Sequence, residues 1–578
     1  MENVNIKING RDYSVPANST VLEAARYAGI DIPTLCYLKD INEIGACRLC
    51  LVEVKGARGL VTACVYPVNE GMEVFTNTAK VLAARKTNLE LVLSNHERKC
   101  LSCVRSTTCE LQKLANEYGC DETHFEGESN HYELDTSTPF IVRDNNKCIL
   151  CRRCIGACAG MQEIGVIGAT DRGFDTHVAS AFEKKLAETS CIGCGQCVVA
   201  CPVGALYEKD DTQKVIDAIA DPTKHVAICA APSVRATIGE CFGFEPGTDV
   251  EGKMVAAMKR LGFDGVYDMN LTADLTIMEE ATEFLGRVKN GGALPLITSC
   301  SPGWVKYCEH YFPEFTENLS SCKSPQQMFG ALYKTYYAQK MGLDPKDIVF
   351  VSAIPCTAKK FEVGRDDQSA AGVPDVDIAI TTRELARLIE RAGINFKALE
   401  DEKFDNPFDI GSGAGVIFGA TGGVMEAALR TAAEVILGKK LEKLEFEEVR
   451  GIAGIKFADY KLGDITVRVA VASGTKNAKE LLNKVKSGEV KVDFIEIMAC
   501  PGGCVNGGGQ PVQSATVRST KNLRELRASV LYTADKNLDL RKSHENSAVK
   551  KLYEEFFGEP NSHKAHEILH TTYVKRGL

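Results

Sequence analysis

The sequence predicts two unlike parts: cysteine-rich α+β domains over residues 1–209, and one α/β domain over residues 210–578. Two observations lead to this fold class. Cysteines recur at short gaps in the first part, and apolar strands alternate with helical segments in the second. A chain of 578 residues is long enough for several such cores.

The composition argues against several classes of protein. A formal net charge of −9 makes a nucleic-acid partner a poor expectation. Residues 1–7 are polar, unlike a signal peptide, and the apolar stretch 416–438 is interrupted by Glu426, Arg430 and Glu434. We therefore expect a cytoplasmic chain with no membrane segment. The chain has 24 cysteines in all, many of them closely spaced. In a reducing compartment, closely spaced cysteines are usually metal ligands.

Residues 1–78 are expected to form a domain with one [2Fe–2S] cluster. Alternating apolar residues on both sides of Asn9-Gly10 predict a β-hairpin. Thr20 and Glu23 have the form of a capping box that begins a helix ending near Gly29, and a strand-like stretch at 51–61 follows. Four thiolates suffice for the cluster, and the spacing C-x10-C-x2-C-x13-C assigns them to Cys36, Cys47, Cys50 and Cys64.

Residues 79–125 are expected to form a small helical domain with a [4Fe–4S] cluster. A helical segment at 79–93 precedes a set of three thiols and one imidazole, namely Cys100, Cys103, Cys109 and His96. Histidine rarely replaces thiolate on iron, so a solvated surface histidine and a structural zinc site are the alternatives.

Residues 126–209 carry the pattern C-x2-C-x2-C-x3-C twice, the second time followed by Pro202. In such a pair the first three cysteines of one motif bind a [4Fe–4S] cluster together with the fourth cysteine of the other. The pattern predicts two clusters, one held by Cys148, Cys151, Cys154 and Cys201, the other by Cys191, Cys194, Cys197 and Cys158.

The α/β domain is predicted from apolar segments that suit buried strands, at 226–229, 295–298, 348–353, 378–380 and 494–498, with helices at 251–261 and 382–392. Glycine-rich runs at 411–415, 419–423 and 507–509 lack the Lys-Ser/Thr ending of a phosphate loop. We expect these glycines to let the backbone pack against a bulky inorganic centre.

Three segments of this domain, 298–304, 354–360 and 498–504, place cysteines just after predicted strands. Ligands in α/β domains converge at the carboxyl ends of strands. Spacing alone therefore predicts a fifth cluster here, with buried inert thiols as the alternative.

The three segments, TSCSPGW, IPCTAKK and MACPGGC, resemble the signature motifs of the [FeFe]-hydrogenases, and the N-terminal cysteine series resembles that of their long clostridial-type members. This resemblance implies an α/β catalytic domain with two sheet-containing lobes, preceded by α+β ferredoxin-like iron–sulfur domains. It also implies an H-cluster, a [4Fe–4S] cubane joined through a cysteine sulfur to a diiron unit with CO, cyanide and azadithiolate. Carried over, Cys356, Cys500 and Cys504 bind the cubane, Cys504 bridges to the diiron unit, and Lys359 holds a cyanide.

The first motif departs from the family pattern. The family usually has two adjacent cysteines before the proline, a proton relay and then a cubane ligand, whereas this chain has Cys300 and Ser301 before Pro302. Thiolate is the better ligand for an iron–sulfur cluster, so we expect Cys300 to be the fourth ligand after a local shift. One alternative is Ser301 bound through oxygen with Cys300 as relay; the other is an incomplete or inactive site.

The resemblance also assigns a proton route to Glu280, Glu283, Ser320 and Arg287. A helix would place the two glutamates and the arginine on one face, which is otherwise typical of a solvated ion-pair face. Cys322 is a candidate replacement relay, with a buried apolar role as the alternative. The pocket is expected to include Ala231, Pro232, Ser233, Pro325, Gln326, Phe418 and Met498, with Ile354 where the family often has methionine.

The expected function is reversible proton reduction and dihydrogen oxidation, with ferredoxin or flavodoxin as electron partner. The cofactors are the H-cluster, one [2Fe–2S] and three accessory [4Fe–4S] clusters, and the diiron unit requires maturation proteins. Two alternatives remain: an iron–sulfur electron-transfer or assembly protein of the same fold without the diiron unit, and a hydrogenase subunit of an NADH-linked bifurcating complex. The sequence has no nicotinamide or flavin fingerprint, so that chemistry would need a separate chain.

Overall fold

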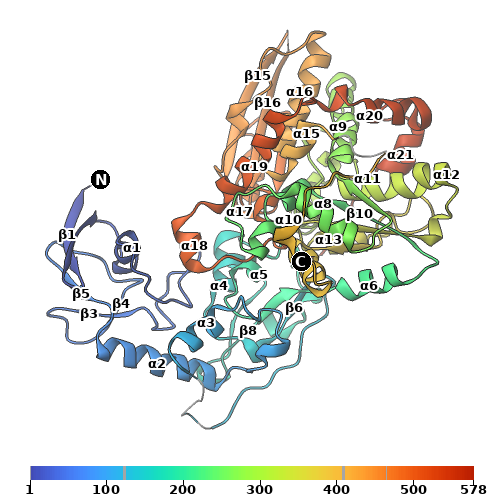
Figure 1. Ribbon diagram of the computed structural model, residues 1–578. Helices are drawn as coiled ribbons and strands as arrows, with labels where there is room; N and C mark the ends of the chain where they lie inside the picture. Colours follow the sequence, from blue (N-terminus) through green and yellow to red (C-terminus); the bar gives the residue numbers. More distant parts are fainter. Residues whose placement is uncertain (1, 121–124, 126, 407–410, 464, 578) are drawn as a thin grey trace. The chain divides into compact units, whose positions relative to one another are not determined.

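The computed structural model describes residues 2–120, 125, 127–406, 411–463 and 465–577 (Figure 1). The chain divides into two compact units. The first comprises Met1–Thr189, Gln196–Tyr207 and Val512–Asn522, and the second comprises Ser190–Gly195, Glu208–Pro511 and Leu523–Leu578. The expected boundary between residues 125 and 126 involves a residue outside the described part. Among the described residues, no helix has the length and apolar character needed to cross a bilayer.

The first unit begins with a five-stranded sheet in the order β2-β1-β5-β3-β4. The predicted hairpin is confirmed as β1 (Asn3–Ile8) and β2 (Arg11–Pro16), with both turn residues at positive φ. The predicted capping box is present at the start of α1 (Val21–Tyr27). The stretch at 51–61 is two short antiparallel strands, β3 (Leu51–Val54) and β4 (Val61–Thr62), rather than one, with β5 (Glu73–Phe75) on the other side of β3.

Short elements carry most cysteines in the rest of the first unit. The predicted helix is α2 (Ala79–Ser94), and α3 (Glu110–Glu117) begins directly after Cys109. Beyond them lie α4 (Arg153–Ile155), the antiparallel pair β7 (Gly168–Thr170) and β8 (His177–Ala179), and α5 (Gln196–Ala200).

One sheet of the second unit is parallel, with strand order β11-β10-β13-β14. Three predicted strands are confirmed as β10 (His225–Ala230), β13 (Ile348–Ala353) and β14 (Ile378–Ile380). The edge strand β11 (Gly265–Asp268) was not predicted. The helices α8 (Glu251–Arg260) and α14 (Thr382–Arg391) agree with the prediction.

The other sheet of the second unit has the order β12-β17-β16-β15. The predicted strands are β12 (Leu296–Ile297) and β17 (Phe494–Met498), which are parallel. The long antiparallel pair β15 (Ile455–Leu462) and β16 (Ile465–Ser473) was not predicted and stands out in Figure 1. Each sheet has its own buried apolar core, so the expected two sheet-containing lobes are confirmed.

A long helix, α9 (Asn270–Asn290), packs against helices of both lobes, as Figure 1 shows for its neighbours α15 (Gly413–Val416) and α16 (Gly423–Leu437). Its other neighbour is α11 (Pro325–Leu332). Most of the helix is buried, so polar residues on it lie inside the protein.

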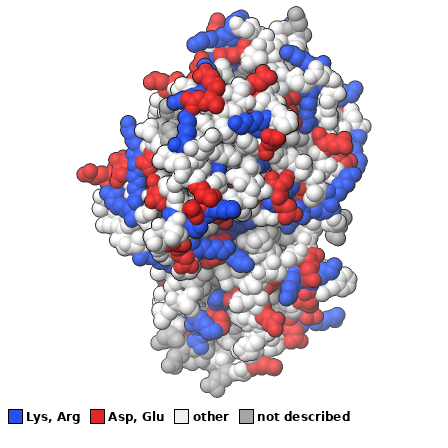
Figure 2. Space-filling view, turned by 90° about the vertical axis from the view of Figure 1, so that its right-hand side faces the viewer, with Lys and Arg blue, Asp and Glu red and all other residues white. Residues whose placement is uncertain are grey.

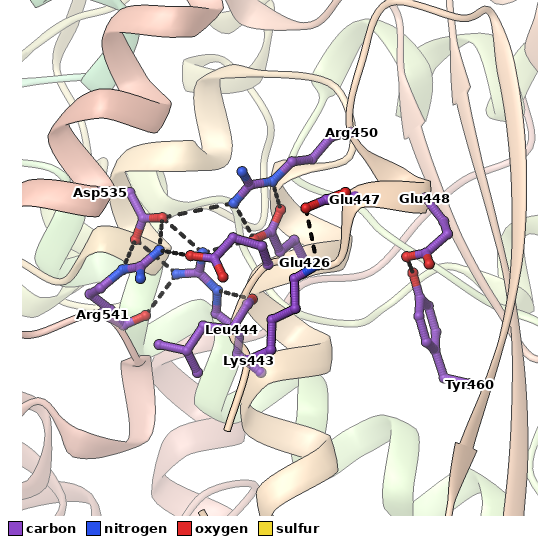
Figure 3. A network of polar contacts seen from close by, with 11 residues as sticks. Glu426, Lys443, Leu444, Glu447, Glu448, Arg450, Tyr460, Asp535 and Arg541 are labelled. Carbon is purple, nitrogen blue, oxygen red and sulfur yellow. Dashed lines mark hydrogen bonds and ion pairs between the residues drawn. The ribbon is translucent and has the colours of Figure 1, made fainter. Parts of the chain in front are cut away.

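A buried ion network joins α16 to α19 (Leu523–Asn537) and the segment after it (Figure 3). Arg430, which is 0% exposed, donates to Glu426 at 2.7 Å and to both carboxylate oxygens of Asp535 at 2.8 Å. Arg450 and Arg541 approach the same carboxylates from the outside. The network holds these helices together, because moving one away would leave a buried charge without its partner, which is unfavourable.

Most of the glycine-rich runs serve close packing of protein on protein. A Cβ on Gly507 would lie 2.1 Å from the carbonyl oxygen of Pro355, and one on Gly413 would lie 2.1 Å from Asp535.

The surface charge is mixed. Basic and acidic side chains are interspersed on the face drawn in Figure 2, and neither sign forms a large patch there.

Candidate active site

A cavity of about 500 Å³ lies in the second unit and is lined by residues of both lobes. Its walls are formed by Ala231, Pro232, Ser233, Met269, Ala273, Cys300, Pro325, Gln326, Ile354, Pro355, Lys359, Phe418, Gly419, Met498 and Cys504. All the pocket residues expected from the sequence are among them except Ser301. Of the described residues in the glycine-rich runs, Gly419 alone lines the cavity.

Sequence reasoning missed Met269 and Ala273, whereas Pro355 lies in a predicted motif segment and Gly419 in a glycine-rich run that was expected to pack against the inorganic centre. Met269 and Ala273 lie one turn apart at the start of α9, which follows the unpredicted strand β11. Prediction of β11 would have pointed to Met269 and Ala273, since residues that follow strand ends line sites in α/β folds.

The thiols of the three motifs follow strand ends, as predicted. Cys300 comes after β12, Cys356 after β13, and Cys500 and Cys504 after β17. Burial and the neighbouring Cys356 thiol raise the pKa of Cys504 to about 12. Cys300 and Cys504 line the cavity, whereas Cys356 and Cys500 lie outside its described lining.

Cys300 and Ser301 face different surroundings. The Ser301 hydroxyl oxygen accepts the backbone N–H of Ala499 at 3.3 Å, next to Cys500. Burial raises the pKa of the Cys300 thiol well above its ordinary value, and the nearby Glu280 and Cys504 raise it further. The Ser301 hydroxyl therefore lies next to the residue that precedes Cys500, whereas the Cys300 thiol lies near Glu280 and Cys504.

The ammonium of Lys359 is buried at the start of α13 (Lys359–Val363). It donates to the Cys300 carbonyl at 3.1 Å and to the Glu362 carboxylate at 2.9 and 3.1 Å. Glu362 also accepts from Ser324 at 2.8 Å and Gln326 at 3.1 Å. Sequence reasoning missed Glu362, although a Lys–Glu pair three residues apart on a helix was the available signal.

The donor set suits an iron–sulfur cluster joined to an anionic metal unit. The hydroxyl of Ser233 is buried in the cavity wall and has no hydrogen-bond partner among the described residues. Together with the buried ammonium of Lys359, it offers donors to an anionic ligand such as cyanide, and the thiols offer soft ligands to iron.

The predicted proton-route residues form a contiguous set beside the cavity. Ser320 donates to Glu283 at 2.8 Å, and Arg287 donates to Glu283 at 2.7 Å. Burial raises the pKa of Glu280 to about 8, and the charge of Glu283 adds to the shift. Glu280 is 1% exposed, so a solvated ion-pair face does not describe it.

Cys322 does not line the cavity in the described part of the chain. It is buried beside the route, with its sulfur 3.9 Å from Glu283 Oε2. Its position is therefore next to Glu283 and not between Glu280 and the cavity.

In the first unit, two predicted cysteine sets are brought together. A cavity of about 370 Å³ is lined by all of Cys148, Cys151, Cys154 and Cys201. In the N-terminal domain, the sulfurs of Cys50 and Cys64 lie 3.3 Å apart, and the Cys47 N–H donates to the Cys36 sulfur at 3.4 Å.

The remaining predicted ligands are His96 with its three cysteines and the second [4Fe–4S] set. His96 is half-buried and its Nδ1 has no partner among the described residues, which suits a metal ligand better than a solvated histidine. Burial lowers the pKa of His96, and burial, with a smaller contribution from the Cys103 thiol, raises the pKa of Cys109. Of the second [4Fe–4S] set, Cys158 and Cys197 belong to the first unit, and Cys191 and Cys194 belong to the second.

Comparisons with known families cover most of the chain. Residues 224–508 match "Iron only hydrogenase large subunit, C-terminal domain" and residues 521–576 match "Iron hydrogenase small subunit". Three further matches are "2Fe-2S iron-sulfur cluster binding domain" at 1–79, "NADH-ubiquinone oxidoreductase-G iron-sulfur binding region" at 85–124 and "4Fe-4S binding domain" at 186–207.

Two individual relatives match this chain over its full length or nearly so, and a solved structure matches part of it. "NADP-reducing hydrogenase subunit HndD" of Solidesulfovibrio fructosivorans is 50% identical, with 100% of both chains covered. "Iron hydrogenase 1" of Clostridium pasteurianum is 44% identical over 99% of this chain and 100% of that one. A solved structure described as "Stepwise [FeFe]-hydrogenase H-cluster assembly revealed in the structure of HydA(deltaEFG)" is 43% identical, has a TM-score of 0.57, and covers 64% of this chain and 100% of that chain. With its cysteine motifs gathered at one cavity, the chain therefore belongs to the [FeFe]-hydrogenases, as a long member with several iron–sulfur domains.

Proposed function

We propose that this chain catalyses 2H⁺ + 2e⁻ ⇌ H2 at the cavity of its second unit. The observation that carries the proposal is the cavity itself, which is lined by Cys300, Cys504 and the buried Lys359. An H-cluster bound there would supply the metal chemistry that makes and splits dihydrogen, while the protein binds it, orients it and excludes water.

We assign the cubane to Cys356, Cys500, Cys504 and, through its oxygen, Ser301. The support is the Ser301–Ala499 contact, which places the hydroxyl next to Cys500. Lys359 and Ser233 are the proposed donors to cyanide on the diiron unit, and Glu362 is a positioning residue that holds the Lys359 ammonium toward the cavity.

Cys300 is the proposed proton relay at the cavity, and Glu280 exchanges protons with it. A carboxyl group whose pKa is about 8 is mostly protonated near neutral pH, so it can donate a proton to the relay and take one up again. Ser320 then connects Glu280 to Glu283, and the Arg287 guanidinium holds the Glu283 carboxylate at the outer end.

Electrons are proposed to reach the cubane through one [2Fe–2S] and three accessory [4Fe–4S] clusters held by the predicted cysteines and His96. Ferredoxin or flavodoxin is the proposed soluble electron partner, and dedicated maturation proteins are expected to deliver the diiron unit. The cysteine groups at 148–154 with 201, and at 36–64, support two of these four clusters by their proximity.

A second candidate function is the hydrogen-converting subunit of a nicotinamide-linked complex. It is favoured by the relative named as an NADP-reducing hydrogenase subunit, which matches this chain from end to end. Nicotinamide chemistry would then reside on a partner chain. An iron–sulfur assembly protein without the diiron unit is the remaining alternative, and the buried Lys359 beside the unpartnered Ser233 hydroxyl opposes it.

Infrared spectroscopy of matured protein tests the proposal. We expect CO and cyanide stretching bands, dihydrogen turnover, and loss of both in a Cys504→Ala variant. A Cys308→Ala variant is the matched control, because Cys308 is a buried thiol in α10 (Pro302–Tyr311) that donates to the Phe312 carbonyl. Iron-loaded protein that lacks the bands after competent maturation would favour the assembly alternative. Reduction of purified ferredoxin, against reduction of NADP⁺ only after a partner chain is added, separates the two electron partners.

A further inference from the structure

A second line of hydrogen bonds leaves Glu283 in another direction. The Ser321 hydroxyl lies 3.3 Å from Glu283 Oε1 and 2.8 Å from Nδ1 of His570. The other ring nitrogen, Nε2, lies 3.1 Å from Glu279 Oε2. His570 is buried, so its imidazole connects two carboxylates of α9 inside the protein.

The backbone holds this imidazole in place. Cys322 and His570 form an antiparallel β-bridge, in which Lys323 N–H donates to Leu569 O and Thr571 N–H donates to Ser321 O, both at 2.8 Å. The hydroxyl of Ser321 and the ring of His570 therefore meet because their backbones are paired.

A second, exposed imidazole lies against the ring of His570. His566 lies one turn earlier in α21 (His563–Leu569), is exposed, and its ring centroid is 4.0 Å from that of His570. The other titratable groups around the His570 ring are Glu279, Glu283 and Cys322, and Tyr553, which donates to Glu279 at 2.5 Å. An imidazole with a hydrogen-bond partner on each ring nitrogen can accept a proton at one nitrogen and release it at the other.

We propose that His570 exchanges protons with Glu283 through Ser321, as a side branch of the proton route. In the inward step, the imidazolium gives its Nδ1 proton to Ser321 Oγ while the Ser321 hydroxyl gives its own proton to Glu283 Oε1. Imidazolium plus carboxylate becomes imidazole plus carboxylic acid, and the reverse step serves dihydrogen oxidation. The inference rests on the proposed function, because the branch joins the route at Glu283.

The first test needs no active cluster. In the full chain produced without maturation proteins, ¹⁵N-histidine NMR follows the titration of His570, identified by its loss in His570→Gln. We expect Glu283→Gln to shift the ¹⁵N resonance of His570 Nδ1, because the acceptor at the far end of the Ser321 hydrogen bond is replaced. Ser321→Ala is expected to change the tautomer balance at Nδ1. If both variants leave the His570 resonances and tautomer unchanged, the branch does not exist.

The second test uses matured enzyme. His570→Gln keeps a polar side chain but cannot carry a proton, so we expect proton reduction near neutral pH to fall about three- to tenfold, less than the ~100-fold typical of a sole acid–base group, since Arg287 and Glu283 remain. Added imidazole should restore turnover in His570→Ala. His544→Gln, which removes a histidine paired with Glu434 at 2.9 Å instead, is the matched control and should keep the wild-type pH profile.

The outcomes separate the two proposals. An unchanged pH profile in His570→Gln, or a loss in His570→Ala that imidazole does not restore, overturns the branch. Matured wild-type protein without dihydrogen turnover overturns the proposed function, whereas the NMR coupling of His570 to Glu283 would persist.

Discussion

Cys300 and Ser301 carry side chains that differ by one atom, sulfur or oxygen, and the fold turns them to different neighbours. The thiol belongs to a residue of the cavity wall, while the hydroxyl accepts from Ala499 beside Cys500. By ligand softness alone, iron would prefer the Cys300 thiol to the Ser301 hydroxyl. The course of the backbone after β12 instead places the hydroxyl beside Ala499. The proposed assignment follows the backbone, because a local shift would have to break the Ser301–Ala499 contact.

Paired substitutions at these positions give the first prediction. Cys300→Ser should lower dihydrogen evolution about 100-fold or more, because a hydroxyl is a far weaker acid than a thiol, while the iron content stays constant. Ser301→Cys should keep turnover and slow the loss of cubane iron to a chelator, because thiolate binds iron more strongly. Iron analysis and gas chromatography measure both. Loss of cubane iron in Cys300→Ser would instead support the shifted assignment.

Single residues also mark where sequence reasoning stops. For two accessory sets, at 36–64 and at 148–154 with 201, the cysteine spacing predicted residues that lie close together, because ligand sets leave a regular pattern in the chain. Glu362 left no such pattern: its importance comes from a contact with Lys359 and from two side chains of another segment, Ser324 and Gln326. Contacts of that kind depend on tertiary packing.

At the scale of elements, buried strands with uninterrupted apolar runs were predicted well, and β13, β14 and β17 begin and end as expected. The strands that were missed are more varied. β11 is four residues long, with glycine at its start and aspartate at its end, and β15 has an exposed face that carries polar residues. β16 was missed as well, although its second half is a buried apolar run. Without these three strands, the sequence could predict the fold class but not the strand order of either sheet.

The ion network between α16 and α19 gives a prediction at this scale. Arg430→Met should lower the free energy of unfolding by about 3–5 kcal/mol, because Glu426 and Asp535 would keep buried charges with fewer partners. Thermal unfolding of the matched variant Lys443→Met is the comparison. Lys443 pairs with Glu447 at 3.0 Å on the surface, so its loss should change stability by less than about 1 kcal/mol. Equal effects of the two substitutions would contradict the structural role of the network.

At the scale of the whole molecule, electron supply and dihydrogen chemistry are assigned to different sets of residues. The accessory cysteines lie mainly in the first unit, and the cavity with its proton route lies in the second. Exchange of dihydrogen with deuterium from solvent needs no net electron flow, whereas turnover with an external partner does.

This division predicts that Cys151→Ala should lower ferredoxin-linked turnover about tenfold or more while hydrogen–deuterium exchange stays near the wild-type rate, since a lost cluster interrupts electron supply alone. Mass spectrometry of HD and D2 measures the exchange, and Cys308→Ala controls for removal of a buried thiol. A parallel fall of exchange and turnover would show that the first unit also shapes the catalytic centre.

The order in which the chain is synthesised gives one pairing a further consequence. Strand β12, which carries the first catalytic motif, is hydrogen-bonded only to β17 among the described strands, and β17 lies almost 200 residues later in the sequence. On the ribosome, Ile297 and Ser299 can contact residues 319–322 early, but the strand pairing beside Cys300 has to wait for β17. The sheet that precedes the first catalytic motif is therefore completed only after most of the polypeptide has been made.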